Sequence, residues 1–373
     1  MNKFFAFIFI SLLVGSAVAQ EVATVNPENH SGGFAKLTNN RVLPASENPI
    51  PLPGKTLSEQ DKNIVHVANQ IIDSNATTSL LLIEKGKIVF EKYKSPGSVD
   101  APLFSQSMSK SLTAYTIGEL LCEGKINSLD AQAGTFAPEL NGTVFGESSI
   151  KDLLTMSSGA KDGITSGQTY AGEWMDIVFK GVTTESILKK YGQRDVTFFG
   201  NPLPGGTEFR YKAVDTYALE HVADRAGDFF NTFENTIWNK SRPQSKGYWL
   251  YDSAKHAQSA SGSSFIARDW ARLAMHSVNV LKNGSPCMQN FMKAATSLQL
   301  PNSSKRIGKA FKGYGYQTWI ADFGGKASYW WVGYGGQRVG IDPESEKILV
   351  LTSYREDYMD SIYKLFSSWQ KNN

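Results

Sequence analysis

Ser107 and Lys110 lie three residues apart in Ser107-Met108-Ser109-Lys110, where an amphipathic helical pattern begins. Positions i and i+3 of a helix share a face, so a helix would direct this hydroxyl and this amine into one site. A serine hydroxyl is a weak nucleophile until a neighbouring base takes its proton, and a desolvated lysine can be that base. The pair therefore predicts a nucleophile with its general base, and the alternative is that Ser107 only caps the helix.

The spacing alone is common in this chain, because Ser-x-x-Lys also starts at Ser148, Ser158, Ser186 and Ser361. Lys110 differs in its helix face, which continues with Ala114, Ile117 and Leu121. A surface lysine normally has polar neighbours on its face. We expect Lys110 to be partly buried, which would lower its pKa and keep part of it neutral for proton transfer.

Two later segments carry groups that could complete such a site. Tyr211 follows Pro204-Gly205-Gly206-Thr207 at a loop-to-helix junction, where its phenol could relay a proton if neighbouring cations lower its pKa. Gly333-Tyr334-Gly335-Gly336-Gln337 lies in a β-rich region, and adjacent glycines let a strand edge approach a ligand and present N–H groups. The alternatives are a packing tyrosine and a tight turn or bulge.

The elements that must position these groups predict an α/β fold of the α+β type. Ser58 caps a helix to about residue 74, and strands at 79–83 and 88–93 follow around Lys85-Gly86. We expect an antiparallel sheet flanked by N- and C-terminal helices, formed by 57–106 and 305–373, with a helical lobe at about 107–304. The remaining expected helices are 107–123, 149–156, 184–191, 213–226, 267–281 and 356–370; the remaining strands are 315–321, 328–332, 337–341 and 347–353.

The N-terminus has the pattern of a cleavable secretory signal over residues 1–19. Lys3 precedes an apolar run, and Ala17-Val18-Ala19 predicts cleavage after Ala19. We expect a periplasmic or secreted protein without stable membrane insertion after cleavage, the alternative being an uncleaved anchor. Residues 20–56 are expected to be an irregular, proline-punctuated leader, and 57–373 to be the folded domain.

Bulk composition narrows the function classes. Hydrophobic residues make up 41% of the 373 residues and charged residues 20%, as in ordinary globular proteins. A net charge of +3 without a long basic run gives no indication of a nucleic-acid partner. Cys122 lies among apolar helix positions and is expected to be a small buried hydrophobe; a disulfide with Cys287 is the alternative.

Together these segments resemble the serine β-lactamase and penicillin-binding protein superfamily. The resemblance is particularly to class C β-lactamase-related hydrolases of the 6-aminohexanoate-dimer hydrolase-like and esterase-like branch, and it spans residues 60–370 in order. Ser107 to Ser111 is similar to the S-x-x-K-S helix start, and 333–337 to G-H-G-G-Q. The other similar segments are Leu153 to Gly159, Pro204 to Thr216, and Ala267 to Leu273.

The resemblance implies acyl transfer in a β-lactamase-like fold without a cofactor or metal. Ser107 would attack the carbonyl, Lys110 would accept its proton, and Tyr211 would pass a proton to the leaving group. Backbone N–H groups of Ser107 and Gln337 would form the oxyanion hole. Tyr334, Gly335 and Gly336 would belong to the substrate-binding strand.

Two positions depart from the family pattern. Ala213 stands where many relatives have Ser or Asn, which removes one polar contact. Tyr334 stands where relatives carry Lys or His, so the cation that helps bind a substrate carboxylate is missing. These departures favour small esters or uncharged amides over β-lactam or D-Ala-D-Ala substrates.

Other classes of site have less support. No serine lies in Gly-x-Ser-x-Gly, and the histidines lack metal-ligand spacing such as His-Glu-x-x-His. No phosphate-binding loop is present, and strands do not alternate with helices as in a dinucleotide-binding fold. A non-catalytic envelope binding protein on the same fold remains the alternative from a different class, with stable rather than transient labelling of Ser107 as its signature.

Overall fold

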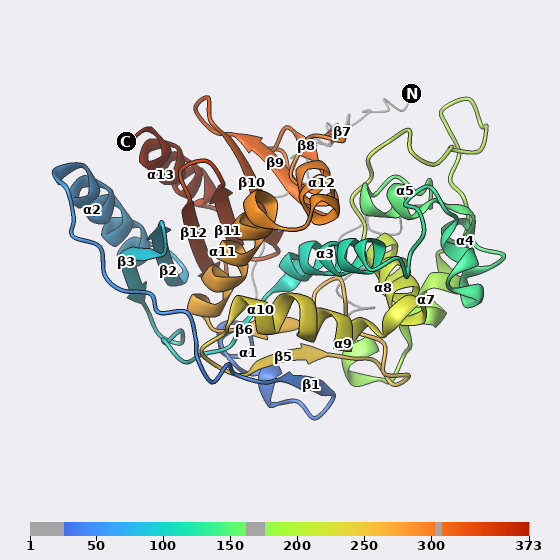
Figure 1. Ribbon diagram of the computed structural model, residues 1–373, viewed down its shortest axis with the longest axis horizontal. Coiled ribbons are helices and arrows are strands. Elements are labelled where there is room, and N and C mark those ends of the chain that lie inside the picture. Colours follow the sequence, from blue (N-terminus) through green and yellow to red (C-terminus); the bar gives the residue numbers. More distant parts are fainter. Residues whose placement is uncertain (1–25, 162–175, 303–307, 373) are drawn as a thin grey trace, which may run out of the picture.

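An eight-stranded antiparallel sheet forms the centre of the molecule (Figure 1). The computed structural model describes residues 26–161, 176–302 and 308–372. The strand order is β3-β2-β12-β11-β10-β9-β8-β7, so N-terminal strands pair with the C-terminal strand β12. The bounds are β2 Thr77–Glu84, β3 Lys87–Tyr93, β7 Leu300–Pro301, β8 Gly313–Tyr314, β9 Trp319–Asp322, β10 Ala327–Gly333, β11 Gln337–Asp342 and β12 Lys347–Ser353.

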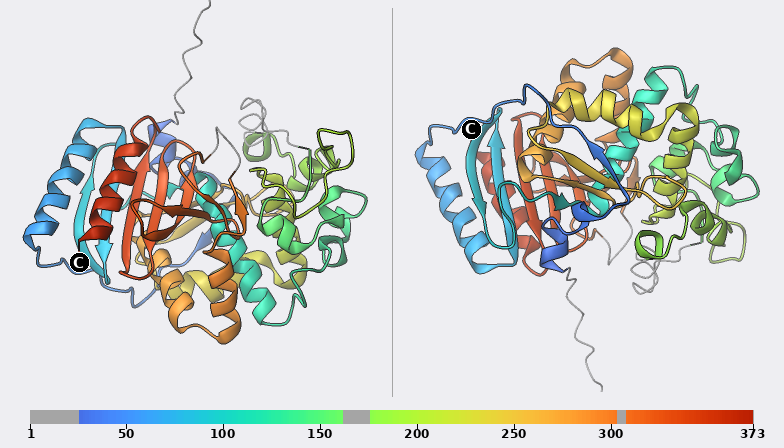
Figure 2. Two further views of the ribbon diagram at one scale, coloured as in Figure 1. Left: turned by 90° about the horizontal axis from the view of Figure 1, so that it is seen from above. Right: turned by 90° about the horizontal axis from the view of Figure 1, so that it is seen from below.

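Both faces of this sheet are covered, which explains why its central strands β2, β11 and β12 are almost wholly buried. Helices α2 (Glu59–Ser74) and α13 (Met359–Lys371) lie side by side on one face (Figure 2). Leu80, Leu82 and Leu349 point into that layer, whereas Leu81 and Ile83 belong to the core on the opposite face. The predicted flanking of the sheet by N- and C-terminal helices is confirmed.

Helix α3 (Ser109–Cys122) runs through the middle of the molecule and joins the sheet to the helical lobe (Figure 1). Its residues from 109 to 120 are all buried, as expected of a helix that is surrounded by other elements. It packs against α8 (Val214–Gly227), α9 (Phe229–Phe233), the π-helix η5 (Glu234–Trp238) and α12 (Pro286–Ala295). Further helices are α4 Val144–Glu147, α5 Ile150–Leu154, α7 Thr184–Lys190, α10 Asn239–Ser241 and α11 Ala267–Asn283.

A second, four-stranded sheet corrects two expectations. Its order is β1-β5-β6-β4, with β1 Asn40–Leu43, β4 Leu103–Phe104, β5 Gly247–Leu250 and β6 Ser263–Phe265. Residues 26–56 are therefore not only an irregular leader, because they supply β1 and the short helix α1 (Pro27–His30). The region 107–304 is not only helical, because it contains β5 and β6. β5 and β6 are short, and each pairs with a strand that is distant in the sequence, so the local residue pattern did not predict them.

The expected strand at 315–321 is correct only for its last three residues, because 315–318 form a turn between two strands. β8 ends at Tyr314 and β9 begins at Trp319, with Gln317 between them at a φ of 50°. The Gln317 side chain accepts a hydrogen bond from Thr216 on α8 and donates one to the carbonyl of Leu153 on α5. This turn therefore connects the large sheet to the helical lobe.

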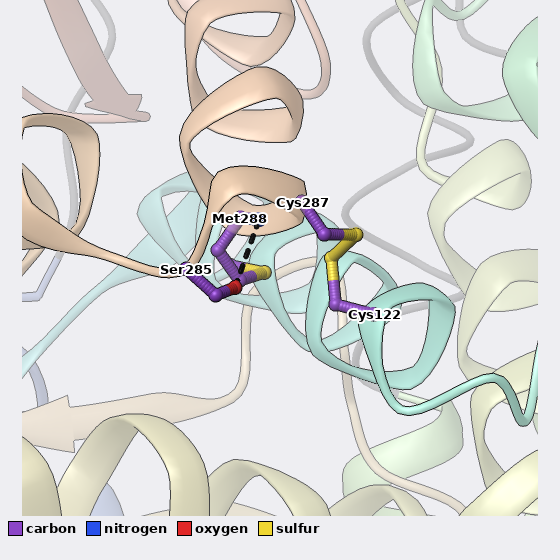
Figure 3. Close-up of a disulfide and its surroundings, with 4 residues drawn as sticks. All are labelled: Cys122, Ser285, Cys287 and Met288. Atoms are coloured by element: carbon purple, nitrogen blue, oxygen red, sulfur yellow. Dashed lines mark hydrogen bonds between the residues drawn. A yellow bond between two sulfur atoms is a disulfide. The ribbon is translucent and has the colours of Figure 1, made fainter.

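Cys122 and Cys287 form a disulfide, so the expectation that Cys122 is only a buried hydrophobe is wrong. Their Cα atoms lie 5.7 Å apart although the residues are 165 positions apart in the sequence (Figure 3). Helix α12, capped by Ser285, packs its Phe291 ring where a side chain at Gly118 of α3 would collide. This tertiary contact brings the sulfur atoms together.

Within the described ranges, no helix has both the length and the apolar character needed to cross a bilayer.

Candidate active site

Ser107 lies in the single turn of 3-10 helix η2 (Gln106–Met108) that leads directly into α3. Gln106 precedes it in the left-handed region, at a φ of 49°, so the chain turns sharply just before the hydroxyl. Ser107 is half-buried, whereas Lys110 is only 1% exposed. The Lys110 ammonium nitrogen Nζ donates to Ser107 Oγ over 3.1 Å. The i, i+3 geometry expected from the sequence is therefore present.

Lys110 is held by a backbone carbonyl on its other side. Its Nζ also donates to the carbonyl oxygen of Ala260 over 2.8 Å, and no carboxylate of the described residues forms an ion pair with it. Burial disfavours the charged form and lowers the pKa of Lys110 from 10.5 to about 7. A substantial fraction of Lys110 is thus neutral near neutral pH, as general-base catalysis requires.

A small network of hydroxyl groups fixes the start of α3. Ser109 Oγ lies 2.7 Å from Ser105 Oγ and 2.8 Å from Ser263 Oγ, and it accepts from the Ser263 N–H. Ser109, the second serine of the motif, is therefore buried and structural. The partner segment 259–264 is wholly buried and was missed from the sequence. Its only signal was a run of small residues, Ser-Ala-Ser-Gly-Ser-Ser.

Tyr211 lies beside Lys110, as a site built from the two motifs would need. Lys110 Nζ is 5.4 Å from the centre of the Tyr211 ring. The ring stacks on Trp319 with centroids 5.2 Å apart and meets the edge of Tyr314. Strands β8 and β9 thereby set the orientation of a side chain that comes from the loop before α8.

The residues that follow Tyr211 anchor this loop. Lys212 is buried and lies 3.3 Å from the Asp215 carboxylate, and it also donates to the carbonyls of Arg210 and Met156. Asp215 accepts from the Ser158 hydroxyl over 2.7 Å. This buried ion pair ties the Tyr211 loop to the 153–159 segment, which explains why both motifs occur together.

Ala213 is buried at the N-cap of α8, where it makes no side-chain cap bond. A serine or asparagine here would offer a polar atom, which the methyl group lacks.

The glycine-rich segment forms the turn between β10 and β11, which is the tight-turn alternative. Gly335 and Gly336 have φ values of 76° and 96°, which favour glycine. A Cβ atom at Gly333 would collide with the carbonyl oxygen of Ser105, so only glycine lets β10 approach the segment before the nucleophile. The Gly336 N–H donates to the Glu356 carboxylate over 3.2 Å. Tyr334 is 48% exposed at the tip of this turn.

Gln337 is buried, and its side chain is held on three sides. Its amide donates to the carbonyls of Tyr334 and Ser353, and its Oε1 accepts from the Ser353 N–H. His30 Nε2 lies 2.6 Å from the same Oε1. Burial outweighs this contact and lowers the pKa of His30 to about 4, so the imidazole is neutral and donates. Residues from the N-terminal leader thus support the turn, which the sequence did not indicate.

The structure therefore brings Ser107, Lys110 and Tyr211 together, with the β10–β11 turn against the segment before Ser107. Residues 69–364 match the Beta-lactamase family. The 6-aminohexanoate-dimer hydrolase of Paenarthrobacter ureafaciens is 23% identical over 312 residues, covering 76% of this chain and 74% of that protein.

Solved structures with the same fold include hydrolases. An assigned 6-aminohexanoate-dimer hydrolase from Bacillus anthracis superposes with a TM-score of 0.70 at 18% identity, covering 93% of this chain and 96% of that one. EstCE1, a hydrolase with promiscuous acyltransferase activity, gives a TM-score of 0.61 at 15% identity, covering 83% and 97%. Because the family match extends over most of the chain, this protein belongs to the beta-lactamase family and is a hydrolase of the beta-lactamase fold.

Proposed function

We propose that this chain is an exported serine hydrolase that cleaves small ester or amide bonds through an acyl-enzyme on Ser107. The observation that carries the proposal is the 3.1 Å contact between Lys110 Nζ and Ser107 Oγ, with Lys110 buried and its pKa lowered to about 7. A neutral amine at this distance can take the hydroxyl proton as the oxygen attacks.

The proposed reaction proceeds in two halves. Ser107 Oγ attacks the substrate carbonyl while Lys110 takes its proton, and the backbone N–H groups of Ser107 and Gln337 stabilise the oxyanion. Tyr211, next to Lys110, passes its proton to the departing alkoxide or amine as the carbonyl–heteroatom bond breaks, and the Lys110 ammonium returns a proton to the Tyr211 oxygen. Water then attacks the acyl-enzyme, releases the acid and returns the proton to Ser107.

Tyr334 supports a substrate without a carboxylate at this end of the site. The resemblance leads us to expect a lysine or histidine here, whereas this chain presents a half-exposed phenol on the β10–β11 turn. A phenol can stack and hydrogen-bond but supplies no positive charge. Esters and uncharged amides are therefore the proposed substrates, ahead of β-lactams and D-Ala-D-Ala peptides.

The disulfide supports the proposed export. Cys122 and Cys287 are joined, and disulfides form and persist mainly in oxidising compartments such as the periplasm or the extracellular medium. This agrees with the signal pattern over residues 1–19, which lies outside the described residues.

The test compares wild type, Ser107→Ala and a matched control, Ser361→Ala. Ser361 also begins a Ser-x-x-Lys pair, but it is exposed on α13. Each protein is assayed on p-nitrophenyl esters, linear amide oligomers and a chromogenic cephalosporin. We expect ester or amide turnover in wild type and Ser361→Ala, with transient acylation of Ser107 by intact mass spectrometry, and none in Ser107→Ala.

Three results would count against this function. Equal turnover in Ser107→Ala and wild type would show that Ser107 is not the nucleophile. Preferential cephalosporin turnover would make the protein a β-lactamase in practice. A permanent adduct on Ser107 without turnover would identify a non-catalytic binding protein.

A further inference from the structure

A second group of buried ionisable side chains lies along α8, beyond the candidate active site. Glu220 is 1% exposed, and its Oε2 lies 3.3 Å from Nδ1 of His256 in the loop after β5. The His256 ring stacks on His221 with centroids 4.0 Å apart. The charged groups around these three side chains include Glu139 on η4 (Pro138–Leu140), Glu185 on α7, Asp224 and Arg225 on α8, and Asp252.

This group is better suited to holding chain segments than to binding a metal. Glu220, His221 and His256 are close enough to share an ion. However, His221 Nδ1 lies 3.1 Å from Glu139, and His221 Nε2 lies 3.1 Å from the Thr184 hydroxyl. The lone pair of an imidazole lies in the ring plane, so two stacked rings do not direct their nitrogens at one ion.

His256 instead carries a charge that Glu220 balances. Burial alone would lower the pKa of His256, but the carboxylates of Glu220, Asp252 and Asp224 together raise it to about 9. His256 is therefore an imidazolium at neutral pH, paired with the buried Glu220.

The other oxygen of Glu220 connects this pair to the proposed general base. Glu220 Oε1 accepts from the backbone N–H of Ala257 over 2.8 Å. One helical turn earlier on the same face of α8, the Tyr217 hydroxyl donates to Gln258 Oε1 over 2.9 Å. Two residues further along, the carbonyl of Ala260 accepts from Lys110 Nζ.

We propose that Glu220 is a positioning residue, which holds the 257–260 segment so that the Ala260 carbonyl orients Lys110 toward Ser107. This proposal rests on the proposed role of Lys110 as the general base. The segment depends on such contacts because it consists of small or polar residues, Ala-Gln-Ser-Ala, which offer little apolar surface for packing. Trp249 on β5 donates to the Gln258 carbonyl and Thr113 on α3 donates to the Ser259 carbonyl. Together with the bonds from α8, these buried hydrogen bonds fix the path of the segment and the direction of the Ala260 carbonyl.

The test measures kcat, KM and the pH dependence of ester hydrolysis in wild type, Glu220→Ala, Glu220→Gln and Tyr217→Phe. Glu220→Gln retains an acceptor for the Ala257 N–H but loses the charge. The control is Ser277→Ala, which removes a buried hydrogen bond to Tyr329 elsewhere in the core. Thermal unfolding of each variant separates loss of stability from loss of function.

We expect Glu220→Ala to lower kcat by about 10-fold to 100-fold, because small displacements of a catalytic group have effects of this size. KM should stay within about twofold of wild type, since the substrate contacts remain. The acid limb of the pH profile should move to lower pH, because the Ala260 carbonyl no longer stabilises the Lys110 ammonium. Glu220→Gln should retain most of kcat, and Ser277→Ala all of it.

A folded Glu220→Ala protein with wild-type kcat and pH profile would overturn the proposal, as would an equal loss of kcat in Ser277→Ala. If Glu220→Ala does not fold, Tyr217→Phe decides, and we expect a smaller change in the same direction. An unchanged Tyr217→Phe profile would then refute the idea. Ser107→Ala in the same series separates the two proposals. Its continued turnover rejects the proposed function, whereas its inactivity beside an unaffected Glu220→Ala rejects only the positioning role.

Discussion

Lys110 makes a quantitative prediction about the pH dependence of activity. Its pKa is lowered from 10.5 to about 7 by burial. With one titrating base, roughly a tenth of Lys110 is neutral at pH 6 and roughly nine tenths at pH 8. If neutral Lys110 takes the proton of Ser107, kcat/KM for an ester should rise about tenfold between these pH values and then level off.

The same group makes stability depend on pH in a defined direction. Because the folded pKa of Lys110 lies below the unfolded value, the unfolded chain binds the additional proton between about pH 7 and 10.5. The free energy of unfolding contributed by this group should therefore rise with pH across that window, by at most about 1.4 kcal/mol per pH unit. Below about pH 7, Lys110 is protonated in both the folded and the unfolded state, so its unfavourable contribution to the free energy of unfolding no longer changes with pH.

Lys110→Met provides the matched variant for both measurements, since it retains the apolar volume without the amine. We expect it to lose ester turnover and, below pH 7, to unfold at a higher temperature than wild type, because no charge must be buried. The assay is a stopped-flow ester titration from pH 5 to 9, with thermal unfolding at the same pH values. A wild-type profile without an inflection between pH 6 and 8, or with the same shape in Lys110→Met, would refute the reasoning.

Three further predictions concern the elements around the site. Replacing Cys122 and Cys287 by serine should cost about 5 kcal/mol, estimated from the loop entropy of a 165-residue separation, with kcat little changed; thermal unfolding and ester assays measure both. Gly333→Ala should reduce Ser107 acylation because its methyl group meets a backbone carbonyl, whereas Gly54→Ala, with open space around it, should not. Lys212→Met should destabilise the fold by about 3–5 kcal/mol, because it leaves the buried Asp215 carboxylate without its ion-pair partner. A free energy of urea unfolding equal to that of wild type would contradict this.

Much of the fold could be predicted because its signals are local. The capping box of Ser58 and Asp61 begins α2 where expected, and Lys85-Gly86 forms the turn of the β2–β3 hairpin. The final helix begins at Met359, three residues later than the expected 356. By contrast, β1, β5 and α12 were missed. β1 and β5 are strands of only four residues whose mutual pairing spans about 200 positions, and α12 begins at Pro286 in a region for which no helix was predicted.

The sequence by itself determined which groups could react and which helix face they share. The period of the helix places Ser107 and Lys110 together, and the apolar stripe below them predicts that the amine is buried. Only the tertiary structure decided how that amine is held. The Ala260 carbonyl lies 150 positions away, Tyr211 about 100, and the disulfide joins residues 165 positions apart. Contacts at such separations depend on how helices and strands pack, so local residue patterns do not predict them.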